Sequence, residues 1–272
     1  MKLINKIIIS LLLLCFLEPL SFGQKDSTFV TQNKYNLSEF GHESVSFIKA
    51  PANWHAMDWV ELGLVGAGTF ALYQYDQRIH DWTLDVNNKH PSYRGNISMT
   101  IGNEWGGFFV GPILCVSLYA TGSFAKSNKT KKIGFEIGQA LIYSEIISFT
   151  SKTIIGRARP NTGRSSDYFT AFAIFRSPYN SFPAGHTDAA FALSTVLAKN
   201  TDSYLLKVAA YIPAALTIAA RVYTEQHWTS DVFIGSALGY FVGNWVVNNH
   251  ENKYSRVQVS SIYPLTLRVS LN

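Results

Sequence analysis

The sequence predicts an all-α fold, a six-helix bundle with a short extended C-terminal tail, and two observations lead to it. First, 47% of the 272 residues are hydrophobic and only 15% are charged, which favours an apolar helical bundle over a disordered chain. Second, the apolar residues beyond Trp54 gather in six stretches of helical length. We expect helices at residues 59–74, 107–125, 134–151, 187–199, 204–221 and 232–248.

The N-terminal residues 1–23 have the pattern of a secretory signal peptide. Two lysines precede an apolar run at residues 7–17, and small residues follow up to Gly23. We expect cleavage near Gly23, with an uncleaved membrane anchor as the alternative, and both predict export to a bacterial-type cell envelope. Cys15 lies inside this segment, so Cys115 is left alone and no intrachain disulfide is expected in the mature chain.

The rest of the chain divides by composition. Residues 24–55 are polar without a sustained period, so we expect a loosely ordered leader before a helical domain at residues 56–248. Residues 249–272 form the tail, where alternation around Pro264 predicts two short strands. The formal net charge of +5 is modest and its basic residues are scattered, so no nucleic-acid partner is expected.

Glycines recur every four residues in the last predicted helix, at Gly235, Gly239 and Gly243. This spacing places a flat stripe on one face and permits close approach of another helix, in a membrane or in a soluble core. The stretch at residues 107–125 has no charge and is long enough to span a membrane, whereas Glu61 and other acids interrupt neighbouring stretches.

The first candidate motif is KTIIGRARP, residues 152–160. Lys152 and Arg159 stand seven residues apart, which is two helical turns, so both cations are expected on one helix face before Pro160 ends the helix. Taken alone, the pattern also fits a basic helix end that complements the helix dipole.

The second motif, FPAGHTDAAFAL, has the pattern of a loop that runs into a helix. Gly185 permits a ligand to approach the backbone, and the unpaired N–H groups of the helix N-terminus favour an anion. His186 is placed to exchange a proton with that anion, although a helix cap or a surface histidine is the plainer alternative.

The third motif, ARVYTEQHWTSDVFIG, sets Arg221 six residues before His227 and Asp231 four residues after it. One helical turn separates His227 from Asp231, so we expect the carboxylate to orient the imidazole and leave its other nitrogen free as a nucleophile. A structural His–Asp pair that caps a helix is the alternative.

The three motifs fall at matching ends of the predicted helices. Arg159 closes the third helix and His186 opens the fourth, while Arg221 closes the fifth and His227 opens the sixth. In an up-and-down bundle all four therefore lie at one end.

On these motifs the sequence resembles the type 2 phosphatidic acid phosphatase family, which shares a superfamily with non-specific acid phosphatases and vanadium haloperoxidases. The resemblance spans roughly residues 56–248 and implies a helical bundle of that kind. The residues that match its signature are Lys152, Arg159 and Pro160, then Pro183, Gly185 and His186, then Arg221, His227 and Asp231.

The resemblance implies a phosphatase that needs no metal or other cofactor. The cations Lys152, Arg159 and Arg221 would hold the phosphate oxygens, together with the backbone of Ala184 and Gly185. The expected substrate is a phosphomonoester or diphosphate, either of an envelope lipid or of a small molecule.

Two histidines would share the chemistry. His227 would attack phosphorus to form a phosphohistidine, and Asp231 would fix the tautomer of His227. His186 would protonate the leaving oxygen and later activate water.

Two positions depart from the family pattern. Ala184 and Ala220 stand where the family usually has serine. Because Ala184 lacks a hydroxyl donor, we expect weakened phosphate binding, by about one hydrogen bond to a charged group.

The segment from Asn161 to Phe182 lies between the first two motifs and is expected to overhang the pocket. Its large side chains either meet a lipid or pack the segment onto the bundle; they are Arg164, Tyr168, Phe169, Phe172, Phe175 and Tyr179. The remaining histidines lack metal-ligand spacing and are expected on the surface: His42, His55, His80, His90 and His250.

The lysine-rich segment at residues 126–132 is expected at the end opposite the pocket. The positive-inside rule makes that end cytoplasmic, so the pocket would face the periplasm. Six spanning helices after a cleaved signal contradict this orientation. Either the N-terminal segment stays as an anchor while the helix with Glu61 does not span, or the bundle is a soluble periplasmic domain. Membrane association is favoured, and the oligomeric state is left open.

Two other functions stay open. A vanadium-dependent haloperoxidase would bind vanadate in the same pocket with His227 as its ligand. A non-enzymatic envelope protein would keep a degenerate pocket, as Ala184 suggests. The short chain and its apolar helices favour the phosphatase.

Overall fold

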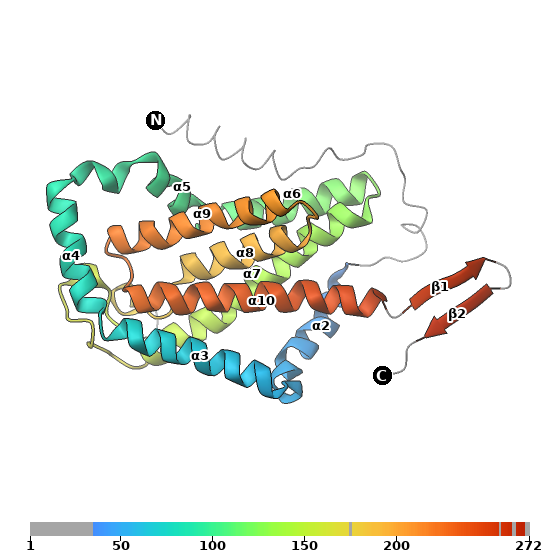
Figure 1. Cartoon of the computed structure of the whole chain (residues 1–272), viewed down its shortest axis with the longest axis horizontal. Coiled ribbons are helices and arrows are strands. Elements are labelled where there is room, and N and C mark those ends of the chain that lie inside the picture. Colours follow the sequence, from blue (N-terminus) through green and yellow to red (C-terminus); the bar gives the residue numbers. More distant parts are fainter. Residues whose placement is uncertain (1–34, 174–175, 256, 263–264, 270–272) are drawn as a thin grey trace.

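The computed structural model describes residues 35–173, 176–255, 257–262 and 265–269. These residues form a helical domain followed by two short strands (Figure 1). The nine α-helices of this part are α2 Leu37–Lys49, α3 Ala56–Tyr73, α4 Asp76–Lys89, α5 Ile97–Trp105, α6 Val110–Phe124, α7 Asn128–Ile155, α8 Gly185–Lys199, α9 Tyr204–Tyr223 and α10 Thr229–Ser255. The antiparallel strands are β1 Val257–Ile262 and β2 Leu265–Val269.

The predicted number of six helices is wrong, because α2, α4 and α5 are additional. None of these three contains a long apolar run, so the periodicity of the sequence does not reveal them. Side-chain caps begin two of them: the Asn36 side chain accepts from Glu39 N at 3.0 Å, and the Asn96 side chain accepts from Met99 N at 2.9 Å. The end of the expected loose leader is therefore helical, while residues 1–34, with the expected signal segment, lie outside the described residues.

The core lies where α8 packs against α10. The glycine stripe of α10 faces α8, and a Cβ on Gly239 would lie 2.1 Å from the carbonyl oxygen of Asp188. Close approach of the two backbones therefore requires glycine there, as the four-residue spacing predicts. Fully or almost fully buried side chains complete the core, among them Ile137, Leu193, Val196, Val246 and Val247.

Helix α2 is held to the bundle by a buried charged cluster. His250 has no exposed surface, and its two ring nitrogens lie 2.8 Å from carboxylate oxygens of Glu43 on α2 and Glu136 on α7. With an acceptor at each nitrogen, the imidazole must carry two protons. The expectation that His250 is a surface residue is therefore wrong, and the pattern failed because its partners come from distant segments.

The stability of the protein is predicted to fall at alkaline pH. Burial alone would lower the pKa of His250, but hydrogen bonds and charges of Glu136 and Glu43 raise it from 6.5 to about 9. Because the pKa of His250 is higher in the folded than in the unfolded protein, its protonation contributes about 3 kcal/mol to the free energy of unfolding below pH 6.5. This contribution is lost as the pH rises through 9. Thermal unfolding between pH 6.5 and 9.5 measures it. In His250→Gln the unfolding temperature should depend less on pH, whereas the exposed control on α2, His42→Gln, should behave like the wild type. Equal pH dependence in the wild type and both variants would contradict the role of His250.

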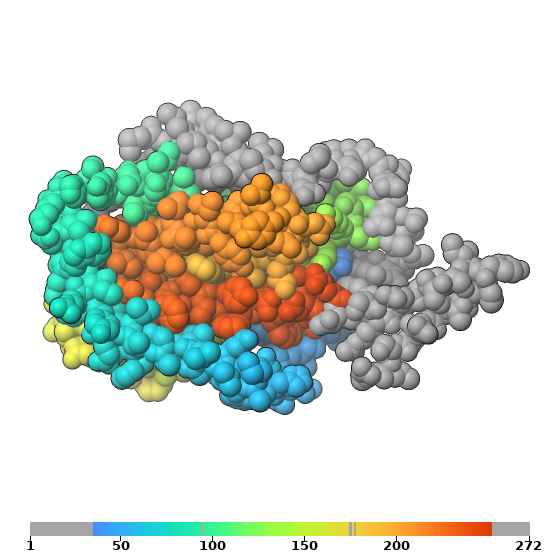
Figure 2. Space-filling view, viewed as in Figure 1, coloured from blue at the N-terminus to red at the C-terminus, as the bar shows by residue number. Residues whose placement is uncertain are grey.

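The bundle brings one end of four helices together beside α4 (Figure 1). There α7 and α9 end while α8 and α10 begin. Helices α3 and α4 wrap around the flank of α10 and the end of α9 at this place (Figure 2). The six predicted helices thus alternate in direction, and the chain segments that join them at this end carry the three motifs.

Among the described helices, α9 is long and apolar enough to cross a membrane. The pair Pro91–Trp105 and Val110–Phe124 passes the same test jointly, with a bend of 55°. The uncharged stretch expected to span by itself is therefore shorter as a helix, because α6 starts only at Val110.

Candidate active site

The first motif is not one continuous helix, contrary to the prediction. Helix α7 ends at Ile155, and Gly156 turns the chain with a φ of 60°. A Cβ on Gly156 would lie 1.7 Å from the carbonyl oxygen of Thr170, so only glycine fits this turn. Lys152 lies in the last helical turn and Arg159 lies beyond it in extended backbone. The two cations therefore do not project from one shared helix face.

Lys152 lies against the loop of the second motif. Its ammonium donates to Ser148 Oγ at 2.7 Å and to the carbonyl oxygen of Pro183. A Cβ on Gly185 would lie 3.2 Å from the Lys152 ammonium nitrogen, so glycine keeps this approach open. The predicted role of Gly185, to let an anionic ligand approach the backbone, stays a prediction.

Three side-chain amides orient Arg159 and Arg221. Gln226 lies within the third motif without a predicted role, and Asn103 and Asn180 lie outside all three motifs. Arg159 donates from Nε to Asn180 Oδ1 at 2.8 Å and from Nη1 to Gln226 Oε1 at 2.7 Å. Arg221 donates from Nη2 to Asn103 Oδ1. The amides come from three separate segments, so no local pattern marks them.

His227 is the buried histidine of the site, with 2% of its surface exposed. Its Nδ1 lies 2.7 Å from the carbonyl oxygen of Ser181, which can only accept, so Nδ1 carries the proton and Nε2 keeps its lone pair. Burial first, then the charges of Arg159 and Lys152, hold the pKa of His227 well below 6.5. His227 is therefore neutral at physiological pH, as a nucleophile requires.

Asp231 does not bind His227 directly, contrary to the prediction. Its carboxylate accepts from Trp228 N at 3.0 Å and from Ser181 Oγ at 2.5 Å. His227 precedes the first residue of α10, so the expected one-turn geometry within a helix does not apply. Asp231 instead accepts from the backbone of Trp228, which follows His227, and from the hydroxyl of Ser181, whose carbonyl oxygen accepts from His227 Nδ1.

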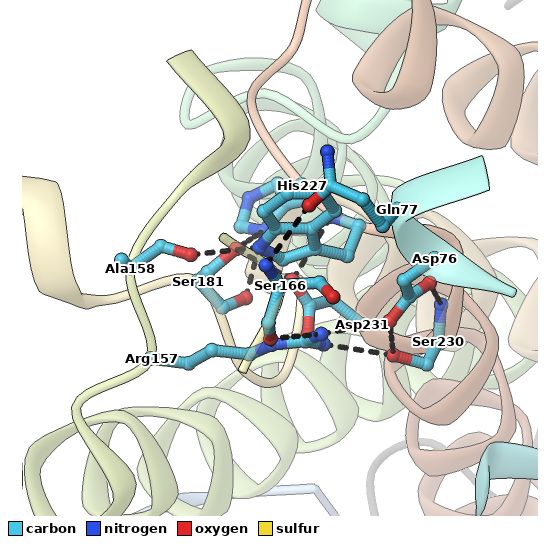
Figure 3. A network of polar contacts seen from close by, with 10 residues as sticks. Asp76, Gln77, Arg157, Ala158, Ser166, Ser181, His227, Ser230 and Asp231 are labelled. Carbon is cyan, nitrogen blue, oxygen red and sulfur yellow. Dashed lines mark hydrogen bonds and ion pairs between the residues drawn. The ribbon is translucent and has the colours of Figure 1, made fainter. Parts of the chain in front are cut away.

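A buried arginine completes this arrangement (Figure 3). Arg157 donates from Nη1 to Asp231 Oδ1 at 2.7 Å and from Nη2 to Asp76 Oδ2 at 2.8 Å. Arg157 lies within the first motif, where no role is predicted for it, and Asp76 lies outside all three motifs.

His186 occupies the first turn of α8, close to all three cations. Burial first, then the charges of Arg221, Arg159 and Lys152, lower its pKa to about 4. A doubly negative phosphate group would offset these charges and raise the pKa of His186 again. The empty site and the substrate-bound site are thus expected to differ in the protonation of this residue.

Ala184 is fully buried, and its backbone N–H donates to the carbonyl oxygen of Asp231 at 3.0 Å. The expectation that this N–H binds phosphate is therefore wrong, because the donor is already used. The N–H groups that follow it, from Gly185 onward, begin helix α8 and keep the predicted orientation for an anion.

Restoring a hydroxyl at this position is predicted to strengthen anion binding. Ala184 has the extended backbone of a helix N-cap and no side-chain cap. Ala184→Ser should bind phosphate or vanadate about tenfold more tightly, since a hydrogen bond to a charged group contributes about 1.5 kcal/mol or more. Inhibition constants of both anions measure it. Ala184→Gly is the control without a hydroxyl; an equal gain in both variants would argue against the hydroxyl.

The segment over the site divides its aromatic residues between packing and exposure. Phe169 lies beside Tyr73, with ring centroids 6.4 Å apart, and Tyr168 lies beside Tyr179. Phe172 is 71% exposed. Both expected roles thus keep support, while Phe175 lies outside the described residues.

His80 is also less exposed than predicted. Its side chain is only 13% exposed and its ring lies edge-on to Trp228, with centroids 5.2 Å apart. Elsewhere in the described residues, no group of three or more His, Cys, Asp or Glu side chains is arranged to hold a metal ion. Cys115 is a free thiol.

Residues 134–255 match the family model of the PAP2 superfamily. This range contains Lys152, Arg159, His186, Arg221 and His227. Over this range the chain is similar to the PAP2 superfamily. The type 2 phosphatidic acid phosphatase resemblance of the motifs is thereby confirmed.

Curated relatives of this chain include two lipid A 1-phosphatases. That of Porphyromonas gingivalis is 42% identical over 66 residues, which are 24% of this chain and 15% of the relative. That of Rhizobium johnstonii is 32% identical over 110 residues, 39% of this chain and 43% of the relative. This chain thus spans less than half the length of either relative.

A solved PAP2 structure has a similar fold. The transmembrane PAP2 type phosphatidylglycerolphosphate phosphatase of Bacillus subtilis superposes with a TM-score of 0.51 at 17% sequence identity. The match covers 69% of this chain and 94% of that one. At this identity the likeness concerns the fold alone.

Proposed function

We propose that this PAP2 protein is a membrane-associated lipid phosphatase that hydrolyses a phosphomonoester through a phosphohistidine, without a metal ion. One observation carries the proposal: three cations from separate segments lie close to the buried His227 and the half-buried His186, and burial first, then these positive charges, lower the pKa values of both histidines. Such a cluster of positive charge is unfavourable by itself and becomes favourable when a multiply charged anion binds.

The mechanism follows from the protonation of the two histidines. The Nε2 lone pair of His227 attacks phosphorus in line with the leaving oxygen, and the bond from phosphorus to that oxygen breaks. His186 donates its proton to the leaving oxygen. Water then attacks the phosphohistidine, His186 takes a proton from this water, and inorganic phosphate leaves with His227 neutral again.

The basic groups replace what a metal ion supplies in other phosphatases. Lys152, Arg159 and Arg221 carry positive charge in fixed positions, because their donors are partly bound to protein acceptors. Fixed charges near the transferring phosphoryl group lower the barrier without reorganising during the reaction.

Apolar side chains on the flanks of the bundle support a lipid substrate and a membrane location. Large exposed hydrophobic residues are frequent on helices that face outward, and an apolar surface of this extent favours contact with lipid. Examples are Trp59, Leu62, Leu64 and Phe70 on α3, Ile113 and Val116 on α6, and Leu205, Val208 and Ile212 on α9. We infer export, with the site at the outer face of the membrane.

A phosphate-release screen on purified protein tests the substrate class. Lipid A 1-phosphate is the first candidate, since both curated relatives act on it by their names. Phosphatidic acid, phosphatidylglycerolphosphate, undecaprenyl diphosphate and soluble esters complete the panel. Release from lipids well above release from soluble esters is expected, and no release from any of them would refute the proposal. Extraction by carbonate would refute the membrane location.

A further inference from the structure

Asp76 lies outside the region that matches the PAP2 family model, at the first position of α4. It is nonetheless 1% exposed and contacts Ser230 and Arg157, in the same network of polar contacts as Asp231 and His227 (Figure 3). One carboxylate oxygen accepts from Ser230 N at 2.9 Å, and the other accepts from Arg157 Nη2 at 2.8 Å. Asp76 therefore binds both the start of α10 and the arginine that holds Asp231.

Arg157 joins the two carboxylates. It is 1% exposed, and its guanidinium lies 4.9 Å from the ring centre of Tyr73 and 5.4 Å from that of Trp228. Its remaining donors reach the carbonyl oxygen of Ser166, at 2.7 and 2.9 Å, and Ser230 Oγ at 2.8 Å. A buried ion held by two acids and flanked by rings keeps one geometry, because any shift leaves a charge unpaired.

The contacts continue from Arg157 to the proposed nucleophile. Asp231 accepts from Arg157 and also from Ser181 Oγ, and the carbonyl oxygen of Ser181 accepts from His227 Nδ1. Each link is a hydrogen bond of 2.8 Å or less between groups that are almost completely buried. A displacement of Asp76 is therefore transmitted to the His227 imidazole through four successive hydrogen bonds.

We propose that Asp76 is a positioning residue for His227, acting through Arg157 and Asp231 to hold the imidazole in line with phosphorus. This inference rests on the proposed phosphatase function. Asp76 does not contact Lys152, Arg159 or Arg221 in any hydrogen bond or ion pair of the described residues, so substrate affinity should not depend on it. The reaction rate should depend on Asp76, because a small misalignment of a nucleophile slows attack strongly.

The test compares Asp76→Asn with Asp85→Asn in the purified full chain. Asn keeps the shape and an acceptor for Ser230 N but removes the charge that holds Arg157. Asp85 lies on the same helix with a side chain 57% exposed, paired only with Lys89 at the surface, so its substitution is the matched control. The substrate is the ester of the panel with the highest turnover, and vanadate inhibition reports the affinity of the phosphate pocket.

The expected result is a kcat ten- to a hundredfold lower in Asp76→Asn, with KM and the vanadate inhibition constant within threefold of the wild type and Asp85→Asn unchanged. An unchanged kcat in Asp76→Asn, or an equal rise in its KM and vanadate inhibition constant, would overturn the inference. The proposed phosphatase function would still stand in that case, because the wild type is active. An inactive wild type would overturn both. Should Asp76→Asn not fold, Ser230→Ala removes only the hydroxyl shared with Asp76 and Arg157, and normal turnover in it would overturn the inference.

Discussion

His227→Ala is expected to abolish turnover, with at least a ten-thousandfold loss of kcat for every substrate. Without the imidazole there is no nucleophile to form the covalent intermediate, and the pocket can only bind phosphate. Vanadate affinity should therefore persist while phosphate release disappears. Rapid quenching with a radiolabelled substrate should trap an acid-labile phosphoenzyme in the wild type and none in the variant.

Two controls separate this role from others. His55→Ala removes a histidine with a 92% exposed side chain and should keep normal activity. A chelator should leave the wild-type rate unchanged, since lysine and arginine carry the positive charge in the proposed mechanism. Turnover by His227→Ala at the normal rate, or inhibition of the wild type by chelator, is incompatible with the mechanism.

His186→Ala is expected to lower kcat about a hundredfold or more for substrates with poor leaving groups. An alkoxide leaves with difficulty unless it receives a proton in the transition state, whereas a nitrophenolate needs little help. The loss should therefore shrink along a series of esters from alkyl to nitrophenyl phosphate. The measurement is the slope of log kcat against leaving-group pKa, which should be steeper in the variant than in the wild type.

The same variant has a distinct pH signature. In the free site, burial and three cations keep the pKa of His186 near 4, so the proton needed for catalysis is taken up with the substrate. The wild-type kcat should fall at alkaline pH as the bound acid loses its proton, and His186→Ala should lack this limb. A uniform loss for all leaving groups, with an unchanged pH profile, would assign His186 to binding alone.

Most of the candidate site could be predicted because its residues lie in local sequence patterns. Lys152, Gly185, His186, Arg221 and His227 each stand at a helix end, and a helix end is visible in the sequence as a change from periodic apolar residues to polar ones. The alternating direction of successive helices then brings those ends together. Family resemblance and helix topology thus lead to the same residues.

The contacts among these residues could not be predicted in the same way. The motif spacing places Asp231 one turn after His227, but the first turn of α10 begins beyond the histidine, and Ser181 accepts its hydrogen bond instead. The amides that orient the arginines, and Asp76, lie up to 154 residues from their partners, as Asp76 and Ser230 do. No local period records such a pairing.

The sequence by itself thus determines that the chain is helical, where the motif residues fall on the helices, and that they gather at one end of the bundle. Only the tertiary structure decides that Arg157, Asp76 and His250 are buried and which groups they bind. The physical reason is that helix formation depends on neighbours within one or two turns, whereas a buried charge is tolerated only when distant segments supply its partners.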